Sequence, residues 1–287
     1  MRRRGHPAFP GARAGQSWGM NASPTRPLAV VTGASSGIGL ELARQFAHNG
    51  FDLLVAAEDD AIQMAAQEIG AEVGDANVDA VQVDLATADG VEELHRRIGA
   101  TGRPVDAIAL NAGIGAGGAF ATDTDLAKEL RLVDLNVRST VHLAKLVLRD
   151  MVARDQGRML LTSSIASTMP GSFQAVYNAS KAFVQSFGLA LREELKETNV
   201  TVTLLMPGPT ETEFFERAEM LDTRLGASDH KDDPVDVARD GFEALMAGKE
   251  RVESASLATK LQGRGGRFLP DSAKAALHRR MAEPGSA

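Results

Sequence analysis

Short apolar runs alternate along this chain with longer segments that carry apolar residues at helical spacing. This alternation is typical of parallel strands joined by helices, because each parallel pair needs a long crossover. Right-handed crossovers place helices on both faces of the sheet. The sequence therefore predicts an α/β fold: a single doubly wound, Rossmann-like domain. The expected strands are Leu28–Thr32, Asp52–Ala57, Val78–Val83, Val105–Asn111, Arg158–Ser163 and Val200–Met206, and the expected helices are Gly37–Asn49, Ala61–Ile69, Gly90–Thr101, Leu126–Ala153 and Ala175–Thr198.

A glycine-rich turn joins the first expected strand to the first expected helix. In such a turn Gly33 allows a tight bend, Gly37 lets the backbone approach a pyrophosphate, and Gly39 lets the helix pack closely on the strand. The free N–H groups and the positive dipole end of the helix attract phosphate. The spacing is GxxxGxG rather than GxGxxG, and a glycine-rich turn alone is a common loop. Its strand–turn–helix context nevertheless indicates a dinucleotide site.

The only tyrosine of the chain, Tyr177, lies four residues before Lys181. If the segment is helical, both side chains project from one face, one turn apart. A lysine ammonium beside a phenol favours the phenolate and lowers the phenol pKa from its ordinary ~10. Ser164, thirteen residues before Tyr177, could hold a substrate oxygen if the fold brings it close. These residues predict a proton-transfer site for an alcohol or a ketone, although a surface tyrosine–lysine pair would show the same spacing.

Taken together, the motifs resemble the short-chain dehydrogenase/reductase family, in particular its smaller, single-domain members. The resemblance covers about Pro27 to Phe242, and its motifs follow in order. Thr32 to Gly39 resembles the cofactor loop, so the resemblance implies cofactor contacts from Gly33, Ser35, Ser36, Gly37, Ile38 and Gly39. Further along, the matches are Asp84 and Leu85 at the adenine, Asn111, Ala112 and Gly113 after the fourth strand, Pro207 and Gly208 beneath the nicotinamide, and Thr210 at its carboxamide.

The resemblance also implies a catalytic tetrad of Asn136, Ser164, Tyr177 and Lys181. Tyr177 would exchange a proton with the substrate while a hydride moves between the nicotinamide and a carbonyl or carbinol carbon. Lys181 would lower the tyrosine pKa and bind the nicotinamide ribose, and Ser164 would hold the substrate oxygen. Asn136 would hold a helix irregularity and a water, although an ordinary helix-surface asparagine is the simplest alternative.

The choice between the two nicotinamide dinucleotides depends on charge at the adenosine ribose, where NADP carries an additional phosphate. Family members that use NADP tend to carry a base before the second glycine of the loop or just after the second strand. This chain has Ser36 and Glu58 there, and Glu58 lies nineteen residues after Gly39. No base is expected nearby except Arg44, which lies inside the first helix. NAD is therefore expected to be favoured over NADP, unless the acids merely begin the next helix.

Composition argues against several other functions. A net charge of −7 disfavours nucleic acid or an anionic membrane as the main partner. The absence of cysteine removes disulfides, thiolate nucleophiles and thiolate metal sites. None of the six histidines is spaced to share a metal with another, so no metal is expected. No run is apolar enough for a signal peptide or a membrane span, and a cytoplasmic protein is expected.

An apolar ketone or secondary alcohol is the expected substrate. The pocket should be lined by a segment from Thr210 to His230, acting as a lid, and by Ile114, Ile165, Met169, Phe173 and Gln174. The same residues could instead pack the lid onto the body. Two other classes remain open: a non-catalytic dinucleotide-binding sensor or scaffold, and a sugar-nucleotide epimerase or dehydratase. The complete tetrad argues against the first class, and the short segment after Pro207 argues against the second.

Both ends of the chain differ from the central domain, which we expect at residues 27–250. Residues 1–26 are rich in arginine and lack acids, which suits a disordered extension, a transit peptide or a start at Met20; we favour an extension without function. Residues 251–287 are expected to form a tail with a helix at Ser272–Met281 and no assigned role; this tail could pack on the body, cover the substrate mouth or touch a partner subunit. Family members commonly associate through two long helices, so a homodimer or homotetramer is expected; the candidate residues are Leu143, Leu146, Val147, Met151, Phe183, Phe187, Leu191 and Leu195.

Overall fold

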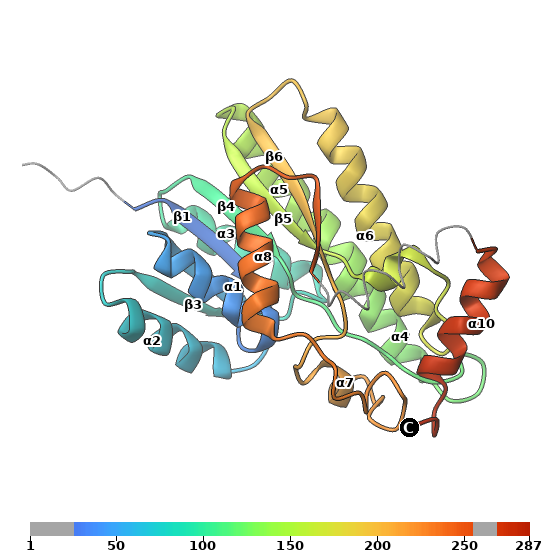
Figure 1. Ribbon diagram of the computed structural model, residues 1–287. Coiled ribbons are helices and arrows are strands. Elements are labelled where there is room, and N and C mark those ends of the chain that lie inside the picture. The colour runs from blue at the N-terminus through green and yellow to red at the C-terminus, as the bar shows by residue number, and fades with distance from the viewer. Residues whose placement is uncertain (1–25, 255–268) are drawn as a thin grey trace, which may run out of the picture.

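The computed structural model describes residues 26–254 and 269–287 and contains a seven-stranded parallel sheet (Figure 1). The strand order is β3-β2-β1-β4-β5-β6-β7, and every neighbouring pair is parallel. The predicted doubly wound α/β fold is confirmed. The strands are β1 (Leu28–Thr32), β2 (Asp52–Ala57), β3 (Val78–Gln82), β4 (Val105–Leu110), β5 (Gly157–Thr162), β6 (Val200–Pro207) and β7 (Arg251–Ser254).

Helices cover both faces of the sheet. Residues of α3, α5 and α6 share one apolar core with the sheet, and residues of α1, α2 and α8 share the other. The helices are α1 (Gly37–His48), α2 (Ala61–Val73), α3 (Ala88–Ala100), α4 (Leu126–Val133), α5 (Thr140–Ala153), α6 (Ala175–Glu194), α7 (Phe214–Arg217), α8 (Pro234–Met246) and α10 (Asp271–Ala282), with a π-helical segment η1 (Asp134–Ser139) and a 3₁₀ turn η2 (Ile165–Thr168).

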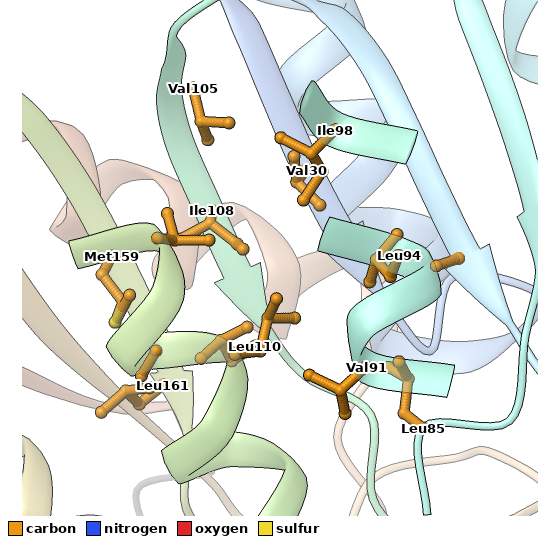
Figure 2. Close-up of a cluster of buried hydrophobic side chains, with 14 of the residues drawn as sticks. Val30, Leu85, Val91, Leu94, Ile98, Val105, Ile108, Leu110, Met159 and Leu161 are labelled. Carbon is orange, nitrogen blue, oxygen red and sulfur yellow. The ribbon is translucent and has the colours of Figure 1, made fainter. Parts of the chain in front are cut away.

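Strands such as β1 and β2 are buried on both faces, which explains why they read as continuous apolar runs, whereas the edge strands β3 and β7 are only partly buried. Successive residues point to opposite faces, so Val30 of β1 enters the core with α3 while its neighbour Val31 enters the core with α1. Figure 2 shows the first of these cores, with Leu94 and Ile98 of α3 beside Val30. Two apolar layers of this kind fix the sheet rigidly and position the loops at its carboxyl edge.

The strand order reverses between β1 and β4, which is the usual place for a ligand site in an open α/β sheet. Side chains connect the strand ends there. The Thr32 hydroxyl accepts hydrogen bonds from the backbone N–H groups of Asn111 and Ala112, at 3.0 and 3.1 Å. Asn111 in turn accepts a hydrogen bond of 3.1 Å from the Thr162 hydroxyl of β5. These bonds hold the ends of three neighbouring strands in a fixed arrangement.

Several elements differ from the sequence-based expectation. The helix expected over Leu126–Ala153 is interrupted by the π-helical segment η1. Sequence reasoning did not identify β7, which pairs with β6, or α8. The helix expected at Ser272–Met281 is confirmed as α10. The extension over residues 1–26 lies outside the described residues except for Arg26, and within 26–254 and 269–287 no helix is both long and apolar enough to cross a membrane.

Most of the residues expected to form an interface between chains pack inside this one. Leu143, Val147 and Met151 are fully buried in the core beneath α5. Another four pack partly buried against the same core: Leu146, Phe187, Leu191 and Leu195. Phe183, at 40% exposure, is the exception. The apolar character of these helices is therefore largely explained by the chain's own core.

Candidate active site

One continuous cavity runs along the carboxyl edge of the sheet, from the glycine-rich loop to α10. Every predicted cofactor contact lines it, from Gly33 to Thr210, together with Ser164, Tyr177 and Lys181. Among the predicted catalytic and cofactor-binding residues, Asn136 alone does not line the cavity. The sheet therefore brings together, in one place, residues that are separated by up to 177 positions in the sequence.

The glycine-rich loop leaves no space for side chains. A Cβ atom at Gly39 would lie 1.9 Å from the Gly33 carbonyl oxygen, so only glycine lets α1 begin this close to β1. Gly37 has a φ of +56°, a left-handed conformation that favours glycine. The N-terminus of α1 opens into the cavity at this point, with Ser36 as its N-cap. A backbone without Cβ atoms at a helix N-terminus fits a pyrophosphate, so the loop fits a dinucleotide.

Carboxylates surround the cavity beyond this loop, where the adenosine end of a dinucleotide would lie. Glu58 and Asp59 follow β2, and Asp84 follows β3. The Asp59 carboxylate accepts a hydrogen bond of 3.0 Å from Ser35 through Oδ2. Its other oxygen, Oδ1, is buried and makes no hydrogen bond to any residue in the described part of the chain. A buried acceptor without a partner fits a ribose hydroxyl, which can donate one.

Arg131 of α4 forms ion pairs with two of these carboxylates. Its guanidinium binds Asp84 in a bidentate manner, at 3.0 and 3.2 Å, and also contacts Glu58. Although burial by itself would raise it, the pKa of Asp84 is lowered, because Arg131 and the Ala86 N–H donate to the carboxylate. The expectation that no base except Arg44 lies near this loop was wrong. Arg44 instead contacts acids on α1 and α2: Glu41, Glu68 and Glu72.

Tyr177 lines the same cavity and lies in the first turn of α6. Ser164, which follows β5, lines the same cavity, and its side chain interacts with the phenol. Burial raises the pKa of Tyr177 to about 12, and the interaction with Ser164 opposes this shift. Burial therefore has a larger effect on the phenol than the neighbouring ammonium on which the sequence analysis relied. The side chain of Phe214 packs against the tyrosine ring, with centroids 5.2 Å apart.

Lys181 lies one turn further along α6 and is buried, at 6% exposure. Its Nζ donates a hydrogen bond of 3.0 Å to the Thr162 carbonyl at the end of β5. Burial lowers the pKa of Lys181 to about 8, because few groups replace the water that would stabilise the ammonium. The lysine is thus held between the tyrosine and the strand end, where it faces the cavity.

Asn136 lies behind the cavity, inside the π-helical segment η1. It is 1% exposed, which rules out an ordinary helix-surface asparagine. Its side chain exchanges two hydrogen bonds with the backbone of Ile114, both at 2.9 Å, and donates a third to Ser180. Asn136 therefore ties the loop after β4 to α6, and the helix irregularity expected at this residue is present.

Apolar side chains line the cavity beyond Tyr177. Four of the expected pocket residues are present there: Ile114, Ile165, Met169 and Gln174. The lid contributes Phe214 and Phe215, whereas Leu221 is 55% exposed. Phe173 does not line the cavity and instead lies beneath Arg279 of α10, 5.4 Å from its guanidinium carbon. Sequence reasoning missed His278 and Met281 of α10, because no local pattern linked this helix to the site.

One cavity joins a glycine-rich loop that fits a pyrophosphate to the cluster of Ser164, Tyr177 and Lys181. Together these two features define a dinucleotide-dependent oxidoreductase. The sequence pattern of the family described as short chain dehydrogenase matches residues 27–221 of this chain. The chain belongs to the short chain dehydrogenase family. Among the residues that the structure describes, no group of three or more His, Cys, Asp or Glu side chains could hold a metal ion.

Relatives and solved structures agree with this family. An NADP-dependent 3-hydroxy acid dehydrogenase from Salmonella typhi is 31% identical, over 63% of this chain and 71% of the relative. Sulfoacetaldehyde reductase 2 from Chromohalobacter salexigens is 32% identical, over 65% of this chain and 74% of the relative. A short-chain dehydrogenase from Sphingobium yanoikuyae, solved with NADPH, superimposes with a TM-score of 0.72 and 25% identity, covering 84% of this chain and 92% of that one.

Proposed function

We propose that this protein transfers a hydride between a nicotinamide dinucleotide and an apolar ketone or secondary alcohol, with Tyr177 exchanging the proton. The observation that carries the proposal is the convergence of Ser164, Tyr177 and Lys181 in the cavity that also holds the glycine-rich loop. A bound nicotinamide supplies the hydride donor or acceptor at its C4 atom. The residues of the chain then have to bind the substrate, orient it and move one proton.

In the direction of reduction, the Tyr177 hydroxyl donates its proton to the oxygen of the substrate carbonyl as the carbon accepts the hydride. The raised pKa of Tyr177 suits this role, because the phenol stays protonated at neutral pH. Ser164 donates a hydrogen bond to the same oxygen and stabilises the negative charge that develops on it. In the direction of oxidation, the tyrosine accepts the hydroxyl proton instead.

Lys181 contributes charge and position. With a pKa of about 8, it is mainly protonated at neutral pH, so its ammonium favours the phenolate that forms after proton donation. Its Nζ keeps two further hydrogens for ribose hydroxyls after donating one to Thr162. Asn136 acts on the reaction through position, because it holds the loop after β4 against α6.

NAD is the proposed cofactor rather than NADP. Three carboxylates lie at the adenosine end, from Glu58, Asp59 and Asp84, against the single guanidinium of Arg131. This balance leaves net negative charge where NADP would place its additional phosphate. The relative named as NADP-dependent argues in the other direction, so the charges within this chain carry the proposal.

The reaction class is supported by the names of the two relatives, since one acts on a hydroxy acid and the other on an aldehyde. The apolar lining of the cavity beyond Tyr177 supports an apolar ketone or secondary alcohol. A homo-oligomeric state and a cytoplasmic location remain predictions that rest on the resemblance and on composition.

A substrate screen tests the proposal, with ketones and reduced cofactor on one side and secondary alcohols and oxidised cofactor on the other. Tyr177→Phe keeps the ring and deletes the hydroxyl, so turnover should fall by about 10²–10⁴-fold with any substrate found. Binding of the dinucleotide, followed by fluorescence titration, should change little. A variant that retains more than a tenth of the wild-type turnover would exclude Tyr177 as the proton donor.

A further inference from the structure

The C-terminal helix α10 is fixed onto the substrate end of the cavity. Its Ala275 carbonyl accepts a hydrogen bond of 3.0 Å from the Ser172 hydroxyl, and the Met281 carbonyl accepts one of 3.0 Å from the Leu225 N–H. After the helix, the Gly285 N–H donates to the Asp222 carboxylate at 2.8 Å. In Figure 1, α10 (red) lies at the right of the view, whereas α1 (blue) and α2 (cyan) lie to its left, on the other side of the sheet's strands β5 and β6 in this view. The helix therefore forms a wall of the cavity far from the dinucleotide loop.

His278 is the polar side chain that α10 brings to this wall. It is 3% exposed and lines the cavity. Its Nδ1 atom lies 2.9 Å from the Ser172 carbonyl oxygen. A carbonyl only accepts hydrogen bonds, so Nδ1 carries the proton and the neutral ring leaves Nε2 as an acceptor. Nε2 makes no hydrogen bond to any residue in 26–254 or 269–287, and it is not fully buried, so it is accessible from the cavity.

The Nε2 acceptor of His278 lies in largely apolar surroundings. Apolar side chains of the same cavity lie around this end: Met169, Phe214, Phe215, Leu225 and Met281. The Nε2 atom is therefore an unpaired acceptor that is open to the cavity, and a ligand in the cavity can donate a hydrogen bond to it. Burial also lowers the pKa of His278 below its usual range, although the Ser172 carbonyl opposes the shift. At neutral pH the ring therefore stays neutral and keeps its acceptor.

Charge near the cavity indicates which kind of donor fits. The Lys231 ammonium lies 5.3 Å from the centre of the Phe215 ring, and Arg217 lines the cavity itself. Each of these cations is paired with a carboxylate, Arg217 with Glu213 and Lys231 with Glu211, so no unpaired charge of the lid calls for a charged ligand group. A neutral hydroxyl or N–H group is thus the donor that suits Nε2.

We propose that His278 is a substrate-binding residue whose Nε2 accepts a hydrogen bond from a neutral hydroxyl or N–H group on the substrate, at the end remote from the reacting carbonyl. The inference rests on the proposed function and narrows its substrate class. The preferred substrate is an apolar ketone or alcohol that carries one additional hydrogen-bond donor. The residue sets specificity and takes no part in the chemical step.

Two series of ketones test this inference. The first consists of alkan-2-ones of increasing chain length, and the second of the same ketones with a terminal hydroxyl group in place of the terminal methyl. For the wild-type enzyme, kcat/KM should favour the hydroxylated ketone at one chain length, which reports the distance from Tyr177 to His278. The quantity to compare between variants is the ratio of the two kcat/KM values at that length.

Two variants separate binding from structure. The amide of His278→Asn can replace Nδ1 as donor to Ser172 but offers no acceptor at the position of Nε2. In this variant the ratio of the two kcat/KM values should fall by roughly three- to tenfold, mainly because KM for the hydroxylated ketone rises. The melting temperature should stay that of the wild type. In His278→Gln the side-chain carbonyl reaches the position of Nε2, so this variant should recover part of the ratio.

Three results would overturn the inference. The wild-type enzyme could prefer no hydroxylated ketone at any chain length, or His278→Asn could keep the wild-type ratio of the two kcat/KM values. The third is that His278→Asn loses the same factor of kcat/KM with both ketones. The Tyr177→Phe variant keeps failure of the proposed function distinct, since it tests proton transfer with either series. Absence of turnover with every ketone would overturn the apolar ketone as substrate, and this inference with it.

Discussion

The Nζ atom of Lys181 lies 5.9 Å from the centre of the Tyr177 ring and donates its hydrogen bond to a strand end, at the Thr162 carbonyl. The lysine therefore acts on the phenol through its charge and is anchored independently of it. Burial opposes the charged form of both groups: it raises the pKa of Tyr177 to about 12 and lowers that of Lys181 to about 8. These opposite shifts determine how the enzyme should respond to pH.

Alcohol oxidation should become faster as the pH rises, because it requires the phenolate of Tyr177, whose pKa is about 12. Lys181→Ala should be most impaired below about pH 8, where the wild-type lysine is charged and favours the phenolate. Above that pH the wild-type lysine is itself neutral, and the two profiles should converge, apart from a constant deficit in ribose binding. The measurement is kcat/KM for oxidation from about pH 6 to about pH 10. Parallel profiles throughout would show that the ammonium has no effect on the phenol.

The free energy of unfolding should depend on pH because Lys181 is buried. The pKa of Lys181 is about 8 in the folded chain and 10.5 as its ordinary value, so between these values the unfolded chain binds more protons. Stability from this residue therefore rises with pH across that window. Relative to Lys181→Met, the wild type should gain on the order of 2–3 kcal/mol between pH 7 and pH 10, by urea denaturation.

Lys196→Met is the matched control for that experiment, since Lys196 is an exposed lysine that forms an ion pair with Glu193. Its free energy of unfolding should follow the wild type at every pH. If Lys181→Met also follows the wild type, the lysine is charged in the folded protein throughout the range.

NAD should bind one to two orders of magnitude more tightly than NADP, as a carboxylate–hydroxyl hydrogen bond at the ribose contributes ~1.5–3 kcal/mol. Glu58→Gln should reduce this preference by removing the charge, and Glu58→Arg should reduce it further or reverse it. Arg131→Met is the informative control, because it leaves Glu58 and Asp84 without their guanidinium and should weaken NADP most. Titration of each variant with both dinucleotides decides the matter. Tighter binding of NADP to the wild type would show that Arg131 leaves Glu58 for the phosphate.

Gly39→Ala should disrupt the dinucleotide loop, because the new Cβ would lie 1.9 Å from the Gly33 carbonyl oxygen. A backbone shift there should cost at least 1–3 kcal/mol of unfolding free energy and weaken dinucleotide binding. Gly70→Ala is the matched control, since Gly70 is also helical and a Cβ there would meet no atom within 4 Å. That variant should gain about 0.5–1 kcal/mol. Equal stability of the two variants in urea would mean that the loop adapts to a side chain.

The sequence predicted most of the sheet, because strands buried on both faces read as uninterrupted apolar runs. The sequence gives no clear signal for β7, because this strand is four residues long and Val252 is its only apolar residue. The helix α8 carried a signal that was overlooked: Asp233 before Pro234 is a helix start, and its carboxylate does accept from the Val235 N–H. Boundaries of this kind can be recognised from local chemistry alone.

Long-range contacts explain what the sequence could not predict at the site. Arg131 is separated from Glu58 by 73 residues and meets it only because α4 packs at the carboxyl edge of the sheet. His278 lies 106 residues from the Ser172 carbonyl that fixes its ring. The motif at Tyr177 was recognisable because its partner lies one helical turn away, whereas these pairs have no local spacing.

The residues that form the nucleotide site and the residues of α10 that line the substrate end of the cavity lie far apart in the sequence. The first third of the chain builds the loop and carboxylates for the nucleotide, and the last segment supplies His278 and Met281 to the far wall. Exchange or mutation of this terminal segment can therefore change which compounds are accepted while the nucleotide pocket stays intact.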